Sequence, residues 1–114
     1  MIHDRCLHCI IGADRARTLR SVRRVLRPGG LFFTITMCGD PVSAGLKQNF
    51  DYATRCQVYG DVAIRYCGHS EDIMAEICAA GFAVLNAQVR AHDAGQGENI
   101  LHIAAISTAA EPQP

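Results

Sequence analysis

The first regular pattern along the chain is an amphipathic helix over residues 14–26. Its apolar positions recur at helical spacing and share one face: Leu19, Val22, Val25 and Leu26. Most of its arginines lie on the other side: Arg17, Arg20, Arg24 and Arg27. Asp14 is the expected N-cap, because its carboxylate can accept from the first free backbone amides. The helix ends at Pro28-Gly29-Gly30, since proline disfavours helical backbone before it and glycine permits a turn with positive φ.

A buried strand is predicted next, over residues 31–37. This run, Leu-Phe-Phe-Thr-Ile-Thr-Met, is almost continuously apolar or β-branched, which is typical of a strand covered on both faces. Gly39-Asp40-Pro41 ends it. Residues 42–67 show no long hydrophobic period, and their aromatic residues are scattered among polar ones. We expect this segment to form short helical turns and loop that cover the rest of the fold.

A second helix is predicted from Ser70 to the residue before Gly81. Ser70 is the expected N-cap, and two acidic residues follow in the first turn, where the helix dipole favours negative charge. Its apolar stripe is Ile73, Met74, Ile77 and Cys78. Strands are predicted over residues 82–89 and 99–107, joined by a flexible connection that contains Gly95-Gln96-Gly97. Residues 109–114 are predicted to be a flexible tail.

The composition indicates one folded domain. The chain has 114 residues, of which 49% are hydrophobic and 19% are charged, so disorder throughout is excluded. No run approaches the ~18 apolar residues of a membrane-spanning helix. The first residues also lack the charged and then apolar pattern of a secretory leader. We therefore expect a cytoplasmic protein that does not bind membranes.

The charges are balanced overall but unevenly placed. The formal net charge is zero, yet residues 1–30 carry seven arginines against two aspartates, a net charge of +5, and the remainder carries −5. A nucleic-acid-binding stripe is usually found on a basic domain with aromatic residues nearby. Aromatic residues make up only 6% of this chain, and none lies between Arg15 and Arg27. A solvated helix face is the favoured interpretation, and no nucleic-acid partner is expected.

The cysteines suggest a metal site only at first sight. Cys6-x-x-Cys9, flanked by His3 and His8, has the spacing of one pair of zinc ligands. A closed structural site needs a second pair at defined spacing, and the other four cysteines are widely separated. We therefore predict no metal site. Reduced thiols are expected rather than disulfides, because no secretory leader is visible and the apolar content is sufficient for a core.

Three segments and the order of the elements around them resemble a known family. The segments are Asp4-Arg5-Cys6-Leu7-His8-Cys9-Ile10, Val25-Leu26-Arg27-Pro28-Gly29-Gly30-Leu31-Phe32 and Ala80-Gly81-Phe82. The second is similar to the "RVLKPGG" segment before the fifth strand of class I S-adenosylmethionine-dependent methyltransferases. The first resembles the segment after their fourth strand, and the third resembles the turn into their sixth strand. The resemblance covers nearly the whole chain and implies an α/β fold, the C-terminal half of a Rossmann-like methyltransferase sheet.

This resemblance implies a particular strand order. Strand 31–37 would be parallel to the fourth strand, strand 99–107 would lie antiparallel beside it, and strand 82–89 would be outermost. Residues 1–108 would then be a partial methyltransferase-like domain, with residues 42–67 as a substrate-side insert. Because almost no fourth strand is present, strand 31–37 would expose one edge. A second copy of the chain or another protein is the expected partner at that edge.

The family's cofactor, S-adenosylmethionine, is implied by the resemblance, but its binding motif is not found. The family holds the cofactor with a glycine-rich turn after the first strand and an acidic residue after the second, since glycine allows close approach and a carboxylate accepts from ribose hydroxyls. No such turn opens this chain, and Gly95-Gln96-Gly97 lies too late. We therefore expect no cofactor binding and no activity by this chain alone. The alternative is a non-catalytic partner or regulator of a full-length methyltransferase.

Candidate site residues come from the resemblance alone. Asp4 lies where relatives contact the cofactor, and His8 lies at the substrate mouth, where its near-neutral pKa suits a general base. Substrate-side candidates in the insert are Arg55, Tyr59, Arg65 and Tyr66. Ordinary structural roles remain open for all of them, such as a helix-capping Asp4 and a packed His8. We expect His69 at a helix entry and His102 on a strand face.

Overall fold

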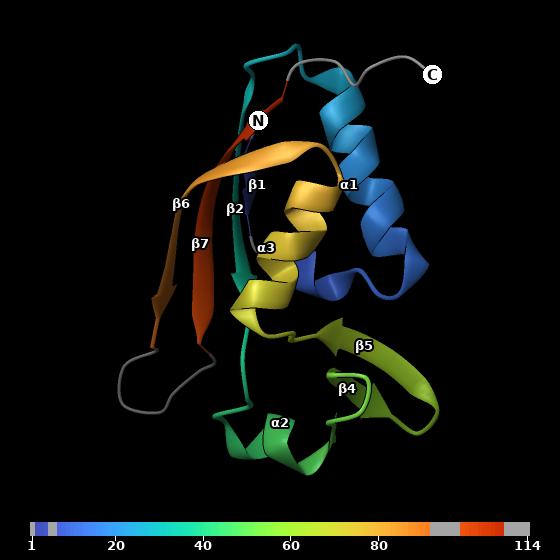
Figure 1. Ribbon diagram of the computed structural model, residues 1–114. Helices are drawn as coiled ribbons and strands as arrows, with labels where there is room; N and C mark the ends of the chain where they lie inside the picture. The colour runs from blue at the N-terminus through green and yellow to red at the C-terminus, as the bar shows by residue number, and fades with distance from the viewer. Residues whose placement is uncertain (1, 5–6, 92–98, 109–114) are drawn as a thin grey trace.

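The computed structural model describes residues 2–4, 7–91 and 99–108 (Figure 1). Its main sheet has four strands in the order β1-β2-β7-β6. Their bounds are β1 Ile2–Asp4, β2 Leu31–Met37, β6 Phe82–Arg90 and β7 Ile100–Ser107. β1 and β2 are parallel, whereas β7 is antiparallel to both of its neighbours. The predicted arrangement of the last three strands is therefore confirmed, with β7 beside β2 and β6 outermost.

The edge of the sheet differs from the prediction. β1 pairs with the middle of β2, in the register Ile2↔Phe33 and Asp4↔Ile35. The three residues of β1 are enough to form this ladder. Over Phe33–Ile35, β2 is therefore a central strand of the described sheet, and β1 is the edge strand. The expectation that strand 31–37 itself forms the exposed edge is wrong over Phe33–Ile35.

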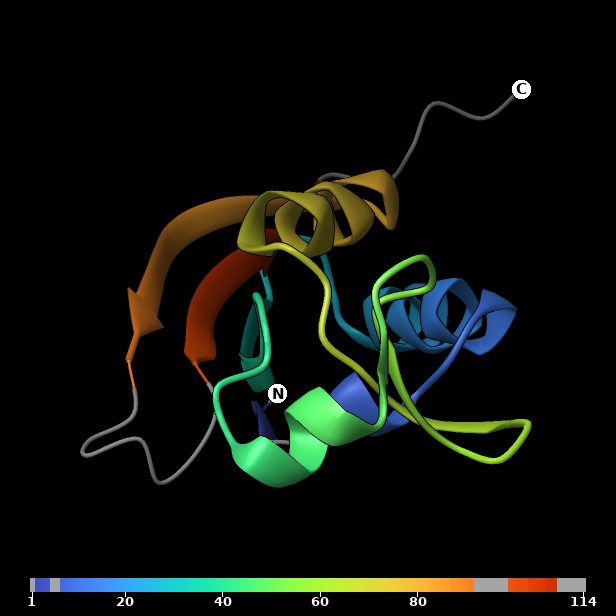
Figure 2. The ribbon, with the colours of Figure 1, turned by 90° about the horizontal axis from the view of Figure 1, so that it is seen from below.

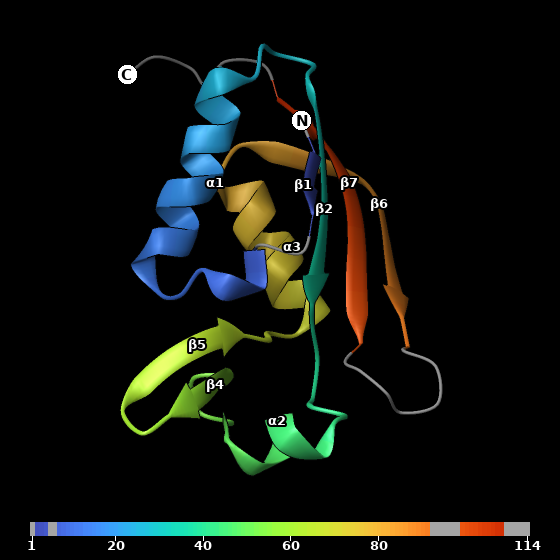
Figure 3. The same ribbon diagram turned by 180° about the vertical axis from the view of Figure 1, so that it is seen from behind.

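Two helices cover one face of this sheet. α1, Ala13–Val25, and α3, Ser70–Ala79, lie on the same side (Figures 1 and 3). Side chains from both helices and three strands form the core on that side: Leu7, Leu19, Phe32, Cys38, Ile73, Ile77, Ala80, Phe82, Leu101, Ile103 and Ala105. No helix among the described residues covers the other face. Burial therefore alternates along β2, and the prediction that this strand is covered on both faces is wrong for the described residues.

Both long helices occupy the predicted segments, but their first residues differ. α1 begins after Gly12, whose φ is 63°, and Asp14 lies in the first turn rather than at the N-cap. Glycine reaches this positive φ without the steric cost that a Cβ imposes. α3 begins at Ser70, so His69 is the N-cap, without a side-chain cap hydrogen bond. His69 thus lies at the helix entry, as expected.

The apolar stripes of these helices are shorter than predicted. Leu19 is buried in α1, and Ile73 and Ile77 are buried in α3. Val25 is 66% exposed and Cys78 is also exposed. α3 stops as predicted at Gly81, which has a φ of 102°.

The insert is the largest departure from the prediction. Residues 42–67 contain one short helix, α2 Ala44–Gln48, and a separate antiparallel sheet in the order β3-β4-β5. The strands are β3 Phe50–Asp51, β4 Cys56–Tyr59 and β5 Val62–Tyr66. A Gly60-Asp61 turn joins β4 to β5, and Gly60 has a φ of 59°. Strands this short carry too few alternations to show a period, so the expectation of helical turns and loop is correct only for α2.

Some predicted features lie outside the described residues, namely Cys6, the connection with Gly95–Gly97 and the tail over 109–114. The side chain of Asp4 also lies outside them, although its backbone belongs to β1. Within the described part of the chain, no helix has both the length and the apolar composition needed to cross a membrane.

Candidate functional site

Several of the candidate site residues lie near the carboxyl edge of the parallel pair β1–β2. In open α/β sheets, ligands bind outside the carboxyl ends of the strands, where loops from different strands meet. Here the 3-10 turn η1, Leu7–Cys9, follows β1 closely, and the insert follows β2. Figures 1 and 2 show α2 and the β4–β5 hairpin beyond the arrowhead of β2. The insert therefore forms a wall at this edge.

His8 lies under this edge, in η1. Its side chain is only 9% exposed, and its Nδ1 accepts a long hydrogen bond of 3.4 Å from the backbone N–H of Met37 at the end of β2. With Nδ1 as the acceptor, the neutral ring carries its proton on Nε2. In this geometry the accepting nitrogen is occupied by the strand, so His8 fixes the end of β2. The general-base role stays a prediction.

A small polar cavity opens between the end of β2 and the insert. Its volume is about 260 Å³. It is lined by residues from β2, α2, β4 and β5: Met37, Ser43, Gly45, Leu46, Asn49, Gln57, Tyr59 and Arg65. We call this cavity the insert pocket. The cavity joins strand-end and insert residues that are up to 28 positions apart in the sequence.

The central feature of the insert pocket is a pair of residues across β4 and β5. Gln57 faces Arg65 in the strand register, and Nη1 of Arg65 donates to Oε1 of Gln57 at 3.0 Å. Gln57 is 6% exposed, whereas Arg65 is exposed. A guanidinium has five N–H donors, so this bond orients the group and leaves four for a ligand or solvent. Tyr59 adds a phenol at the rim.

The four predicted substrate-side residues do not form one cluster. Tyr59 and Arg65 both line the insert pocket. Tyr66 lies on the opposite face of β5, because successive side chains of a strand alternate between faces. Its hydroxyl has a pKa raised above the ordinary value of 10.0, mainly by burial and then by the charge of Glu76. The structure therefore brings together two of the four.

Arg55, the fourth candidate, braces the insert. Its Nη1 donates to Oδ1 of Asp40 at 2.9 Å, its Nε donates to the carbonyl of Cys67 at 3.2 Å, and its guanidinium lies 5.3 Å from the Phe50 ring centroid. Its φ of 60° is left-handed, which costs a non-glycine residue about 1–2 kcal/mol. These contacts offset that cost. They tie the β3–β4 turn to the segment after β2.

Arg15 is the structural residue that sequence reasoning missed. It is 3% exposed, and its Nε and Nη2 donate to the two carboxylate oxygens of Glu76 at 2.9 and 2.8 Å. Its Nη1 donates to the carbonyls of Leu7 and Ile10 at 2.7 and 3.1 Å, and its guanidinium lies 4.3 Å from the Tyr66 ring centroid. One side chain thus holds η1 against α3 and β5. A signal was present, because Arg15 lies four residues before Leu19 on the apolar face of α1.

Metal binding finds no support in the described residues. No group of three or more potential metal ligands occurs among them. Cys9 is exposed, His8 is bonded to β2, and Cys6 lies outside the described residues. The five described cysteines form no disulfide with one another. Burial raises the pKa of the Cys38 thiol, so this cysteine behaves as a core residue rather than a nucleophile.

Comparison with known proteins gives a result only at the level of three-dimensional structure. No protein-family model matches the chain. No curated protein matches it significantly either.

Solved structures, in contrast, match almost the whole chain. A SAM-dependent methyltransferase from Methanosarcina mazei matches 95% of it with a TM-score of 0.75 and 14% identity. The 1,6-didemethyltoxoflavin-N1-methyltransferase of Burkholderia thailandensis, with bound 1,6-didemethyltoxoflavin and S-adenosylhomocysteine, matches 94% with a TM-score of 0.67 and 20% identity. The chain has the fold of about half a class I methyltransferase. It spans 58% and 42% of the length of these two proteins.

The methyltransferase fold does not by itself establish methyl transfer. The [4+2]-cyclase SpnF also matches 96% of this chain, with a TM-score of 0.62 and 14% identity. At these identities the likeness establishes the fold alone, and function depends on the site.

The residues at the carboxyl edge do not fit a complete S-adenosylmethionine site. After β2 the chain reads Cys38-Gly39-Asp40-Pro41, which contributes one carboxylate to this edge. The carboxylate of Asp40, which could accept from a ribose, is already paired with Arg55. Among the described side chains at this edge, none offers the donor and acceptor set of a nucleoside pocket. These residues can supply one wall of such a site.

Proposed function

We propose that this chain is the acceptor-side part of an S-adenosylmethionine-dependent methyltransferase and that it is inactive alone. The observation that carries the proposal is the insert pocket, which lies between the carboxyl end of β2 and the insert in a methyltransferase-like fold. Ligand sites of α/β sheets occur at this edge. The cofactor is part of the proposal because a protein of the same fold contains S-adenosylhomocysteine.

The lining of the insert pocket favours a small acceptor with oxygen atoms. Arg65 is positioned by Gln57 to bind a carboxylate or another oxygen-rich group, and Asn49 and Tyr59 can hydrogen-bond beside it. A volume of about 260 Å³ is below the range of pockets that enclose drug-sized ligands. In this proposal the chain binds and orients one polar end of the acceptor.

The first test measures ligand binding to the purified chain. We expect calorimetric titration with S-adenosylmethionine to give no measurable binding at micromolar concentrations. Nuclear magnetic resonance titration with a panel of small aromatic and aliphatic carboxylates should shift the signals of Gln57, Tyr59 and Arg65. An Arg65→Ala variant should lose these shifts, whereas the matched control Arg90→Ala, at the end of β6, should keep them. Micromolar cofactor binding, or shifts confined to other regions, would contradict the proposal.

The alternative function is a non-catalytic partner of a complete methyltransferase. It is favoured by the uncovered apolar face of the main sheet, where Leu31 and Phe33 are 43% and 41% exposed. Exposed apolar surface of this kind is typical of an interaction site. If this alternative is correct, substitutions in the insert pocket have no effect on the activity of the partner enzyme, whereas Phe33→Lys abolishes complex formation in size-exclusion chromatography. Loss of activity on pocket substitution would instead support the acceptor site.

A further inference from the structure

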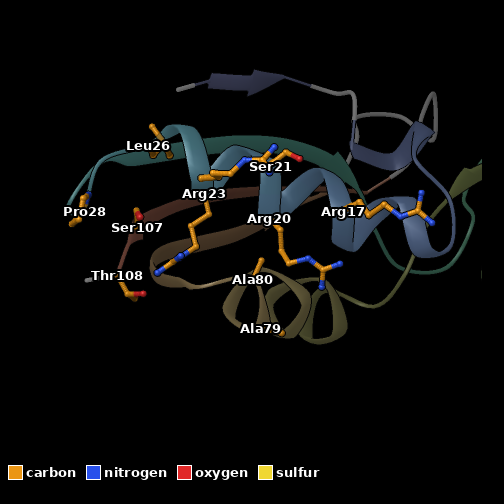
Figure 4. Close-up of a pocket in the computed structure, with 11 residues that line it drawn as sticks. Arg17, Arg20, Ser21, Arg23, Leu26, Pro28, Ala79, Ala80, Ser107 and Thr108 are labelled. Atoms are coloured by element: carbon orange, nitrogen blue, oxygen red, sulfur yellow. The ribbon is translucent and has the colours of Figure 1, made fainter. Parts of the chain in front are cut away.

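A second cavity, separate from the insert pocket, lies between α1 and the carboxyl end of α3. It has a volume of about 740 Å³ (Figure 4). Four arginines of α1 contribute to its lining: Arg17, Arg20, Arg23 and Arg24. Its remaining surface is mostly apolar or small, with Leu26, Pro28, Ala79 and Ala80 among its residues. We call this cavity the arginine groove.

The positive charge of the arginine groove is not neutralised within the described part of the chain. No Asp or Glu among the described residues lines the groove. Arg20 and Arg24 form no ion pair with any described residue. Arg17 pairs with Asp14 at 3.3 Å, but both side chains are exposed, and an exposed ion pair contributes little to stability. The groove therefore presents at least two guanidinium groups without an acidic partner in that part of the chain.

One of the four arginines has a clear structural role. Nε of Arg23 donates to the carbonyl of Gly81 at 3.1 Å, and α3 has no basic residue of its own in its last turn. Arg23 thus supplies positive charge at the negative end of α3. Figure 4 shows Arg20 extending from α1 toward Ala79 and Ala80, whereas Arg23 extends on the side of Thr108. This role accounts for Arg23 but leaves Arg17, Arg20 and Arg24 without a structural explanation.

The spacing of these three arginines indicates an elongated ligand. They lie at positions i, i+3 and i+7 of α1, about 4.5 and 6 Å apart along the helix axis at 1.5 Å per residue. A helix packed along α1 presents carboxylates at the same spacing when Glu or Asp occupies its own i, i+3 or i+4, and i+7 positions. Because the groove also has an apolar lining that includes Leu26 and Pro28, the ligand needs apolar side chains between its acids.

We propose that the arginine groove binds an acidic amphipathic helix of a partner protein. Two observations favour a peptide over a nucleic acid. No aromatic side chain of the described residues lines the groove, so bases have no ring on which to stack. The chain also has no net positive charge to support general attraction to a polyanion. Guanidinium forks match carboxylates in a bidentate geometry, which gives such a helix both orientation and register.

Fluorescence anisotropy with the full chain tests this proposal. The probe is a labelled helical peptide with Glu at i, i+3 and i+7 and Leu between them, and the comparison ligands are a scrambled peptide of equal composition and a single-stranded RNA oligonucleotide. We expect the designed peptide to bind at least about tenfold more tightly than either, a difference of about 1.4 kcal/mol. Arg20→Glu with Arg24→Glu should weaken its binding at least about thirtyfold. The matched control, Lys47→Glu with Arg90→Glu, makes the same change in net charge elsewhere and should change it less than about threefold.

Each other outcome overturns the proposal. Equal binding of the scrambled peptide means general charge attraction, and tighter binding of the RNA means a nucleic-acid site. Equal loss in both double variants means that the groove is not the binding surface. No binding of the designed peptide by the unmodified chain at about 1 mM, roughly the weakest affinity that the assay detects, also overturns it. Circular dichroism of each variant verifies that it is folded, which is expected because Arg20 and Arg24 are exposed.

Discussion

The two faces of the main sheet are made from similar residues but have different surroundings. Phe32 and Phe33 are neighbours in β2, yet Phe32 is fully buried under the helices and Phe33 is 41% exposed on the other face. Ile35 and Ile106 are half-buried on that second face. A β-strand alternates its side chains between faces, so an apolar run specifies two apolar surfaces. The described residues cover only one of them.

The second face is not uniformly apolar. Its apolar residues concentrate on β2, next to the edge strand β1, whereas toward β6 it carries Asn86, Gln88 and His102 around a cavity of about 290 Å³. His102 thus lies on a strand face, as expected. The apolar part is adjacent to the edge strand β1 of the described sheet. We therefore propose that the partner expected from the sequence, a second copy or another protein, would bind this part of the face and β1 rather than the edge of β2.

The largest expected effect comes from testing the two phenylalanines against each other. Phe32→Ala should lower the free energy of unfolding by about 3–5 kcal/mol, because it leaves a cavity in the core. Phe33→Ala should lower it by about 1 kcal/mol or less, since much of the ring is already in water. Urea unfolding followed by circular dichroism measures both. Equal losses would mean that the second face is covered in solution.

A nearly equal loss of stability is expected when Arg15, which joins η1 to α3, is replaced. Arg15→Leu should cost about 3 kcal/mol, because it leaves the Glu76 carboxylate and two backbone carbonyls without their partner. Arg17→Leu is the matched control in the same helix and should change stability by less than about 0.5 kcal/mol, since its pair with Asp14 is exposed. The same urea titrations compare the two. A small loss for Arg15→Leu would show that η1 is held by other contacts.

A smaller effect is expected when a charge is placed on the second face and self-association of the chain is measured. The chain has a mass of 12.4 kDa, and we expect light scattering at low micromolar concentration to give a larger mass. Phe33→Lys should raise the dissociation constant at least about tenfold, or about 1.4 kcal/mol, because a charge replaces an apolar ring on the second face. Val62→Lys, at an exposed position of the insert, is the control. A monomeric unmodified chain would contradict the expected partner surface.

The smallest effect is a dependence on alkaline pH. Burial raises the pKa of Tyr66 above 10.0, so the folded protein holds this proton more tightly than the unfolded chain does. The resulting stabilisation is complete below the unfolded-state pKa of 10.0 and is lost as the pH rises through the folded-state pKa. Tyr66→Phe, which keeps the ring over Arg15, should therefore flatten the loss of stability above about pH 10. Tyr52→Phe is the exposed control, and an equal flattening there would contradict the assignment.

The sequence predicts an element correctly where a long hydrophobic pattern is bounded by proline or glycine. The run over 31–37 follows Pro28-Gly29-Gly30, and α3 ends at Gly81 where φ is 102°, so both boundaries depend on local chemistry that the sequence displays. Arg23 lies so close to Gly81 that a Cβ at this position would overlap its side chain, which is a second reason for glycine there.

Prediction fails where tertiary contacts decide. The helical spacing places Arg15 on the apolar face of α1, but no local pattern indicates that Glu76 and two backbone carbonyls accept its hydrogen bonds. The insert sheet escapes prediction because its strands have only two to five residues, and the one usable signal is Gly60-Asp61 between two apolar segments. Tyr59 and Arg65 share a pocket and Tyr66 does not, because side chains alternate between the two faces of a strand. The sequence predicts no strand in this segment, so it could not separate these candidates.

The position of β7 has a consequence for how the protein is made. β2 leaves the ribosome long before β7, which starts 63 residues after β2 ends, yet β7 forms one entire side of the β2 ladder. Among the described residues, β2 can pair only with the three residues of β1 until residues 100–107 have been synthesised. Contacts this distant in sequence slow folding, and they leave an apolar strand edge open to other nascent chains. The completion of β7 is therefore the step of synthesis that removes this open edge from β2.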